Sequence, residues 1–211
     1  QLNSHADECG RSHLEKMTSM PTVIDLSAAD DYFTRYPLIT DMGSDGYILT
    51  WQDGEGQNNN GASTYYALSS DLKTWTCKGT LFEKKFLRIG SGFSMVYRYY
   101  TNATTHLLSD GRLMAVASFW CTDTYSSSGV DAQDNYVLDQ AMKDHGIVVK
   151  FSSDYGKTWG SEQIVYYGPN WETHIMETAS GRIELYFAES RPKISGSHSG
   201  TSMIYSADGG K

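Results

Sequence analysis

The sequence predicts an all-β protein built from propeller blades, and three observations support this fold class. Short alternating strands begin near a glycine, a second strand follows each of them, and the pair ends in a compact turn that contains Ser and Asp. This passage occurs three times along the chain. The composition agrees, because aromatic residues make up 13% and Gly numbers 20 while Pro numbers only 4. Such usage suits many short strands joined by tight turns.

The clearest copy of the turn is KFSSDYGKTWGSEQ, from Lys150 to Gln163. Strand-like runs flank it, which predicts a hairpin connection. Asp154 is suited to accept hydrogen bonds from backbone N–H groups ahead of it, and Gly156 accommodates a positive φ. The indole of Trp159 is large enough to fill the small core of the hairpin. We therefore expect the turn to be structural.

Two further copies of the turn define a repeat. In LSSDLKTWTCKG the shared residues are Ser70, Asp71, Thr74 and Trp75, without the glycine. IYSADGGK opens a third copy around Asp208. The aspartates lie 154 − 71 = 83 and 208 − 154 = 54 residues apart, so the repeated unit is a small sheet with insertions of variable length. We expect the three aspartates at peripheral turns.

This turn resembles the Asp box, or bacterial neuraminidase repeat, of the sialidase-like superfamily. The resemblance covers about Phe33 to Lys211 and implies a six-bladed β-propeller, of which 211 residues would hold about three blades. We accordingly expect residues 1–30 to form an irregular lead-in and residues 31–211 a partial propeller, the N-terminal half of a longer protein. The rest of the propeller is then required to cover the open sheet edges.

Two stretches carry candidate site residues through this resemblance. FTRYPLITDM resembles the Arg-Ile-Pro element of sialidases, which implies that Arg35 binds a substrate carboxylate; a structural ion pair is the alternative. NWETHIMETASGRIELYFAESRP resembles both the Trp-Glu element of exo-arabinanases and the stretch with the sialidase catalytic glutamate. It implies Glu172 as a catalytic residue, with Trp171 and Arg191 binding substrate. The alternative for Glu172 is a solvated glutamate at a strand end.

The chemistry implied by these residues is glycoside hydrolysis by carboxylates. An indole next to a carboxyl group favours the protonated form, and a general acid must carry a proton to the leaving group. Sialidases hold an acid/base aspartate on the loop after the inner strand of the first blade. Here that loop reads WQDGEGQNNNGAS, with Asp53 and Glu55 as its carboxylates, so Asp53 is the second catalytic candidate. The same Asn-rich loop equally suits hydrogen bonding to sugar hydroxyls.

Two classes of function stay open on the sequence alone. The resemblance implies an exo-acting glycoside hydrolase that releases terminal sugars from a polysaccharide or glycan, of arabinan or sialoside type. The alternative is a non-catalytic Asp-box propeller that binds carbohydrate or protein, because this fold serves both purposes. Neither a cofactor nor a metal is expected in either case.

Charge and composition argue against other partners. A formal charge of −8 without a basic run argues against nucleic acid, and no apolar run approaches the ~20 residues of a membrane helix. We expect a secreted or periplasmic protein, any signal peptide having been removed before Gln1. Cys9, Cys77 and Cys121 fit no zinc spacing and leave a disulfide or reduced core thiols open.

Three smaller patterns also bear on possible sites. His5, Cys9 and His13 are spaced by four, which on a helix would form a metal trio, although a plain tail is the favoured interpretation. Asn102 begins the glycosylation sequon NAT, which has meaning only if the source glycosylates. The long irregular passage from Cys121 to His145 is expected to shape the rim of a pocket.

Overall fold

The computed structural model describes residues 4–6, 12–14, 35–53, 63–88, 95–121, 145–189 and 200–210. Regular structure in these residues is β throughout, apart from one 3-10 turn, η1, at Gly43–Asp45. The strands are β1 (Ser4–Ala6), β2 (Ser12–Leu14), β3 (Arg35–Asp41), β4 (Tyr47–Gln52), β5 (Thr64–Ser69), β6 (Thr76–Phe82), β7 (Lys85–Arg88), β8 (Met95–Leu107), β9 (Leu113–Cys121), β10 (Gly146–Ser152), β11 (Gln163–Tyr167), β12 (Asn170–Glu177), β13 (Ile183–Glu189) and β14 (Gly200–Ser206). Among the described residues, no helix has the length and apolarity that a membrane span requires.

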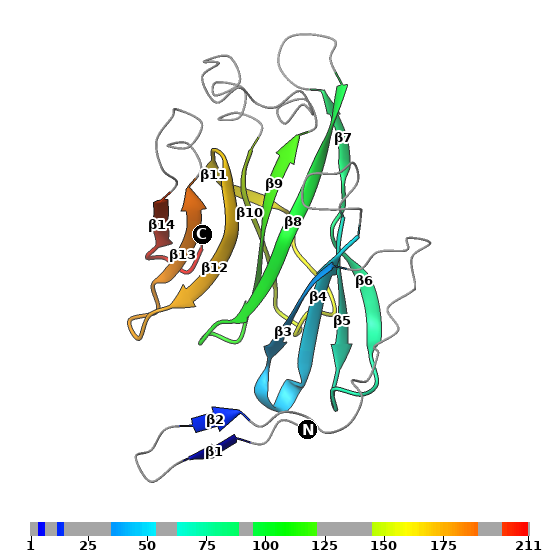
Figure 1. Cartoon of the computed structure of the whole chain (residues 1–211), viewed down its shortest axis with the longest axis vertical. Helices are drawn as coiled ribbons and strands as arrows, with labels where there is room; N and C mark the ends of the chain where they lie inside the picture. Colours follow the sequence, from blue (N-terminus) through cyan, green and yellow to red (C-terminus); the bar gives the residue numbers. More distant parts are fainter. Residues whose placement is uncertain are drawn as a thin grey trace.

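Three antiparallel sheets follow one another along the chain and lie side by side (Figure 1). Their strand orders are β3-β4-β5-β6, β7-β8-β9-β10-β11 and β12-β13-β14, and we call them blades 1, 2 and 3. Strand β8 contacts both β3 and β12. The innermost strands of the three blades are therefore β3, β8 and β12. Neighbouring innermost strands contact each other, as they do around the axis of a propeller. The prediction of a partial β-propeller is confirmed.

The blades pack face to face, and the period-two alternation of β9 explains how. All nine residues of β9 are buried. Alternate residues from Leu113 to Phe119 join one core cluster with Ile48 and Phe82 of blade 1. Val116, on the other face, joins a second cluster with Leu185 of blade 3. A strand that is apolar on both faces must be covered on both, so blade 2 is held between its two neighbours.

The Asp-box turn between β10 and β11 forms the hairpin that the sequence predicts. The Asp154 carboxylate accepts hydrogen bonds from the Thr158 hydroxyl at 2.6 Å, the Thr158 N–H at 2.8 Å and the Ser152 hydroxyl at 2.7 Å. Trp159 is partly buried and packs against the core between blades 1 and 2. Its ring meets Tyr66 edge-on at 5.9 Å, so the indole fills space between two blades and not only within its own hairpin.

The other two copies lie at corresponding places, each after the third strand of its blade. In the β5–β6 turn the Asp71 carboxylate accepts the Thr74 N–H at 2.7 Å. The serine that donates to Asp71 is Ser69, so the serine of this copy that corresponds to Ser152 is Ser69 and not Ser70. After β14, Asp208 accepts the Ser206 hydroxyl at 2.6 Å. All three turns follow strands far from the inner ones, which supports their structural interpretation.

The bonds around Asp154 predict a specific acid sensitivity. Hydrogen bonds, first from the Thr158 hydroxyl and then from its backbone N–H, lower the pKa of Asp154 from 3.8 to about 2. A carboxyl group whose pKa is lowered by folding stabilises the folded state at pH values above its ordinary pKa. This stabilisation is lost as the pH falls through the pKa of the folded state. We expect the advantage in melting temperature of the parent over Asp154→Asn to shrink between about pH 4 and pH 2. A constant difference over pH 6 to 2 would contradict the assignment.

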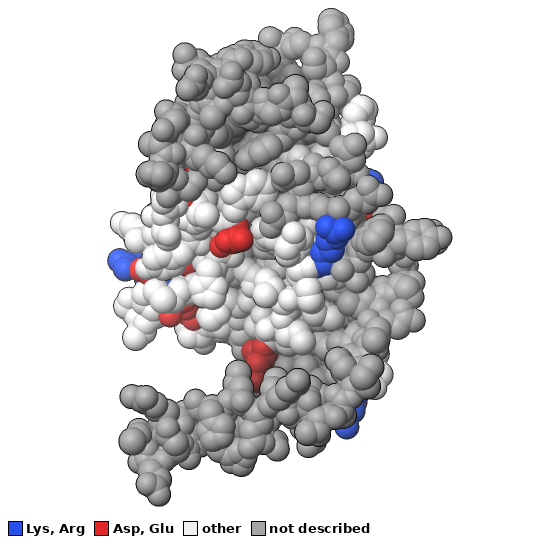
Figure 2. Space-filling view, in the orientation of Figure 1, with Lys and Arg blue, Asp and Glu red and all other residues white. Residues whose placement is uncertain are grey.

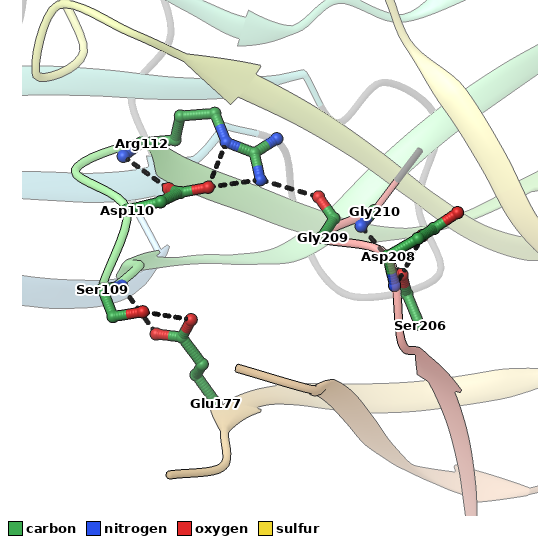
Figure 3. Close-up of polar contacts among 8 residues, drawn as sticks. All are labelled: Ser109, Asp110, Arg112, Glu177, Ser206, Asp208, Gly209 and Gly210. Atoms are coloured by element: carbon green, nitrogen blue, oxygen red, sulfur yellow. Dashed lines mark hydrogen bonds and ion pairs between the residues drawn. The ribbon is translucent and has the colours of Figure 1, made fainter. Parts of the chain in front are cut away.

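A polar contact joins blades 2 and 3 at the ends of β8 and β12 (Figure 3). The Ser109 N–H and hydroxyl donate to the two oxygens of Glu177 at 2.6 and 2.8 Å. Arg112, on the same turn, is paired with Asp110 and donates to the carbonyl of Gly209 in the third Asp box at 2.7 Å. Glu177 ends the strand on which Glu172 lies, so these bonds fix β12 against blade 2.

The N-terminal lead-in contains a short hairpin. Strands β1 and β2 pair antiparallel, with His5 opposite His13. His5 and His13 lie in strands, so they do not share the helix face on which the alternative metal trio depended. Cys9 lies outside the described residues, as do residues 122–144 of the predicted rim passage, whereas Cys121 is buried at the end of β9.

Candidate functional site

The innermost strand of every blade has a one-residue β-bulge at the same place. In each bulge, the inner strand advances by three residues while the neighbouring strand advances by two. The bulges lie between Arg35 and Leu38 on β3, between Thr101 and Thr104 on β8, and between Trp171 and His174 on β12. Bulges redirect side chains and are frequent beside active sites. Three of them on adjoining inner strands mark this part of the axis as the candidate site.

One residue in each bulge has a left-handed backbone. The φ angles are 54° at Tyr36, 52° at Asn102 and 56° at Glu172. This conformation costs a residue other than glycine roughly 1 to 3 kcal/mol, and such strain concentrates at functional sites. Leu72 and Tyr155, the other non-glycine residues with positive φ in the described chain, both follow an Asp-box aspartate. The strain thus recurs at two repeated positions, one structural and one at the axis.

Hydrogen bonds between blades hold the three bulges together. The Gln52 Oε1 atom, at the end of β4, accepts the Thr101 hydroxyl at 2.7 Å and the Asn102 N–H at 3.1 Å. In the next blade, the Ser118 hydroxyl donates to Asn170 Oδ1 at 2.7 Å. Gln52 and Ser118 each lie opposite the first residue of a bulge. The repeat therefore connects each bulge region to the inner strand of the following blade.

Glu172 is the exposed carboxylate of this site. It forms no hydrogen bond or ion pair with the described residues. The half-buried Trp171 precedes it, and the buried Thr173 follows it with a hydroxyl oxygen that has no partner in the described chain. A carboxylate on a rigid strand that is not committed to the protein is available to exchange a proton with a ligand.

The other predicted site residues have different surroundings. Asp53 follows β4 and is 6% exposed, with its oxygens accepting the Ser63 N–H at 2.6 Å and the Tyr65 hydroxyl at 2.9 Å. Asp53 therefore has a structural role, because these bonds join the two ends of the loop between β4 and β5. Arg35 begins β3, half-buried, opposite Gln52. Arg191 lies outside the described residues.

Sequence reasoning treated Asn102 only as a sequon and did not single out Gln52 or Glu189. A spacing would have found Asn102, because it precedes its hairpin glycine, Gly111, by 111 − 102 = 9 residues, as Glu172 precedes Gly181 by 181 − 172 = 9. No comparable spacing in the sequence indicates the hydrogen bonds of Gln52 to β8. Glu189 is buried at the end of β13 and accepts the Tyr166 hydroxyl at 2.7 Å.

His145 also lies at this end of blade 2, where it is buried. It lies directly before β10 and is 2% exposed. Burial lowers the pKa of His145 to about 3, so the imidazole is neutral at physiological pH. Figure 2 shows few and separate charged side chains on the described surface of one face, with no continuous basic area there.

Comparison with known proteins gives structural matches. No protein-family model matches the chain, and no curated protein does. The xylan β-1,4-xylosidase of Bacillus halodurans C-125 superposes with a TM-score of 0.56 and 15% identity, over 97% of this chain and 34% of that one. An endo-arabinase of Bacteroides thetaiotaomicron VPI-5482 gives 0.49 and 16% over 83% and 57%, and a sialidase 0.46 and 11% over 83% and 20%.

The chain spans about a third of the length of the xylosidase. At this identity the likeness concerns the fold, and it agrees with the three bladed sheets described above. The fold predicted from the Asp boxes is confirmed: the chain is a partial β-propeller.

Proposed function

We propose that the protein is an exo-acting glycoside hydrolase that removes terminal sugars from a polysaccharide or glycan, of arabinan or sialoside type. The observation that carries the proposal is Glu172, an exposed carboxylate in a strained bulge on an inner propeller strand. Keeping such a residue in a left-handed conformation destabilises the fold, and function is the usual reason for it. A polymeric substrate outside the cell requires a secreted or periplasmic enzyme, which is the location we propose.

Glu172 acts in this proposal as the general acid. Its proton passes to the glycosidic oxygen as the bond from that oxygen to the sugar breaks, which leaves positive charge on the sugar ring. Trp171 supplies an apolar face beside the carboxyl group, and Arg35 and Arg191 bind anionic or hydroxyl groups of the substrate. Asp53 as a second catalytic carboxylate remains a prediction, to be tested separately because of its bonds to Ser63 and Tyr65.

A non-catalytic propeller that binds carbohydrate is the second candidate, and the Asp53 geometry favours it. Hydrolysis of a glycoside generally uses two carboxylates. Both carboxylate oxygens of Asp53 accept hydrogen bonds, from the Ser63 N–H and the Tyr65 hydroxyl, so Glu172 is the more available of the two predicted acids. With a single available carboxylate, the same bulged strands would serve recognition instead of cleavage.

The two candidates are separated by one assay on the full-length protein. Incubation with arabino-oligosaccharides and with sialosides, followed by chromatography of the products, is expected to show release of sugars from one chain end. Calorimetric titration of the same glycans measures binding independently. Binding without any released sugar would reject the hydrolase and support the binding propeller.

A further inference from the structure

Two buried amide nitrogens at the bulge of β8, the strand next to that of Glu172, have no hydrogen-bond partner in the described chain. They are Nε2 of Gln52, a residue 1% exposed, and Nδ2 of the partly buried Asn102. A buried donor without a partner is unfavourable, because it loses its bonds to water and gains none. In native structures such an atom calls for an explanation, and a ligand acceptor is one.

The orientation of these amides follows from the bonds that they do make. The Gln52 Oε1 atom accepts both the Thr101 hydroxyl and the Asn102 N–H. Its carbonyl end is therefore committed to β8, and the NH2 end remains for another acceptor. The bond to the Asn102 N–H also stabilises the left-handed backbone there, so Gln52 both adjoins Asn102 and holds it in place.

Asn102 occupies on β8 the position that Glu172 occupies on β12. Both are the left-handed residue of a bulge, both lie nine residues before a hairpin glycine, and β8 contacts β12. We infer that Asn102, supported by Gln52, binds a hydroxyl group of the sugar whose glycosidic bond is presented to Glu172. This inference rests on the proposed glycan substrate and identifies a binding residue for it.

The alternative use of Asn102, as a glycosylation acceptor, conflicts with the structure. Glycosylation requires access to Nδ2, whereas this atom is buried. A ligand hydroxyl is smaller, and the terminal amide torsion of asparagine is broad enough to turn Nδ2 toward it. The sequon therefore coincides with a site for a sugar that is bound and not attached.

The test is a titration that compares variants of the full-length protein. Arabinotriose and sialyllactose are titrated calorimetrically into Glu172→Gln, which slows turnover, and into Glu172→Gln combined with Asn102→Gly or Asn102→Asp. Glycine keeps the left-handed backbone and removes the amide, while aspartate keeps the shape and loses the donor. We expect the dissociation constant for the recognised glycan to rise about tenfold in both, as for the loss of a hydrogen bond in a desolvated site.

Leu72→Gly in the same background is the matched control, because it also places glycine at a left-handed position, in an Asp box. Its affinity should equal that of the background. Unchanged affinity in Asn102→Gly and Asn102→Asp would overturn the inference, and Asn102→Asp alone decides it if the glycine variant does not fold. Glycan binding without hydrolysis by the parent would reject only the hydrolase, whereas no glycan binding at all would reject both.

Discussion

Replacing Glu172 by glutamine is expected to lower the turnover of a natural glycoside by about 10²- to 10⁴-fold. Glutamine keeps the size of the side chain and its capacity for hydrogen bonds, but it carries no transferable proton. The natural leaving group is a poor one and depends on protonation as the bond breaks. Glycan affinity should change little, since Glu172 forms no hydrogen bond or ion pair with the described residues that the exchange would break. Steady-state kinetics and calorimetry on the full-length protein measure both quantities.

The leaving group distinguishes proton transfer from a general loss of structure. An activated aryl glycoside needs little protonation, so Glu172→Gln should lose far less activity on it than on the natural substrate, provided that glycosylation limits the rate. Glu83→Gln is the matched control, because Glu83 is exposed on the connection between β6 and β7. It should leave both activities unchanged. Equal activity of Glu172→Gln and the parent on the natural substrate would remove Glu172 from the mechanism.

The Asp-box hairpins were predictable because their stability is local. In the β10–β11 turn, Ser152 and Thr158 both donate to Asp154 within seven residues of chain, so residue types and spacing determine the structure. The naming of Ser70 in place of Ser69 in the first copy also follows from this dependence on local spacing. With one residue fewer between Asp71 and Trp75, the bonding serine was placed one position too late, since two serines precede the aspartate.

The bulges of the inner strands were not predictable in the same way. A bulge depends on the register between two strands, and the bond that supports Asn102 comes from Gln52, 50 residues earlier. No local pattern shared by Tyr36, Asn102 and Glu172 indicates a left-handed backbone, because these three residue types differ. The resemblance to known propellers made Glu172 a candidate, and the spacing to a hairpin glycine relates Asn102 to it, but only the paired strands show that both residues lie in bulges.

Substituting Gly146 by alanine is expected to destabilise the protein by roughly 3 kcal/mol, at the upper end of the usual cost of overpacking. Gly146 begins β10, which lies between β9 and β11 in blade 2, and it is paired with Phe119 and Tyr167. A β-carbon there would lie 2.1 Å from the Tyr166 carbonyl oxygen and 2.6 Å from two ring carbons of Phe119. The carbonyl belongs to the backbone of β11. The Phe119 ring is covered by the Arg98 guanidinium, which lies 4.2 Å from the ring centroid. Neither the carbonyl nor the ring can therefore move away easily from an added β-carbon.

Gly200→Ala is the control for this substitution, because the added β-carbon would meet nothing within 4 Å. Gly200 begins β14. The free energy of unfolding of the Gly200→Ala protein should stay within about 0.5 kcal/mol of that of the parent. Denaturant melts of the two variants measure the difference, and equal stability would show that β11 yields freely. Activity should also fall in Gly146→Ala, because Tyr166 donates its hydroxyl to Glu189, which is paired with Asn170 at the start of the Glu172 strand. A shift of β11 would thus reach the carboxylate through two contacts.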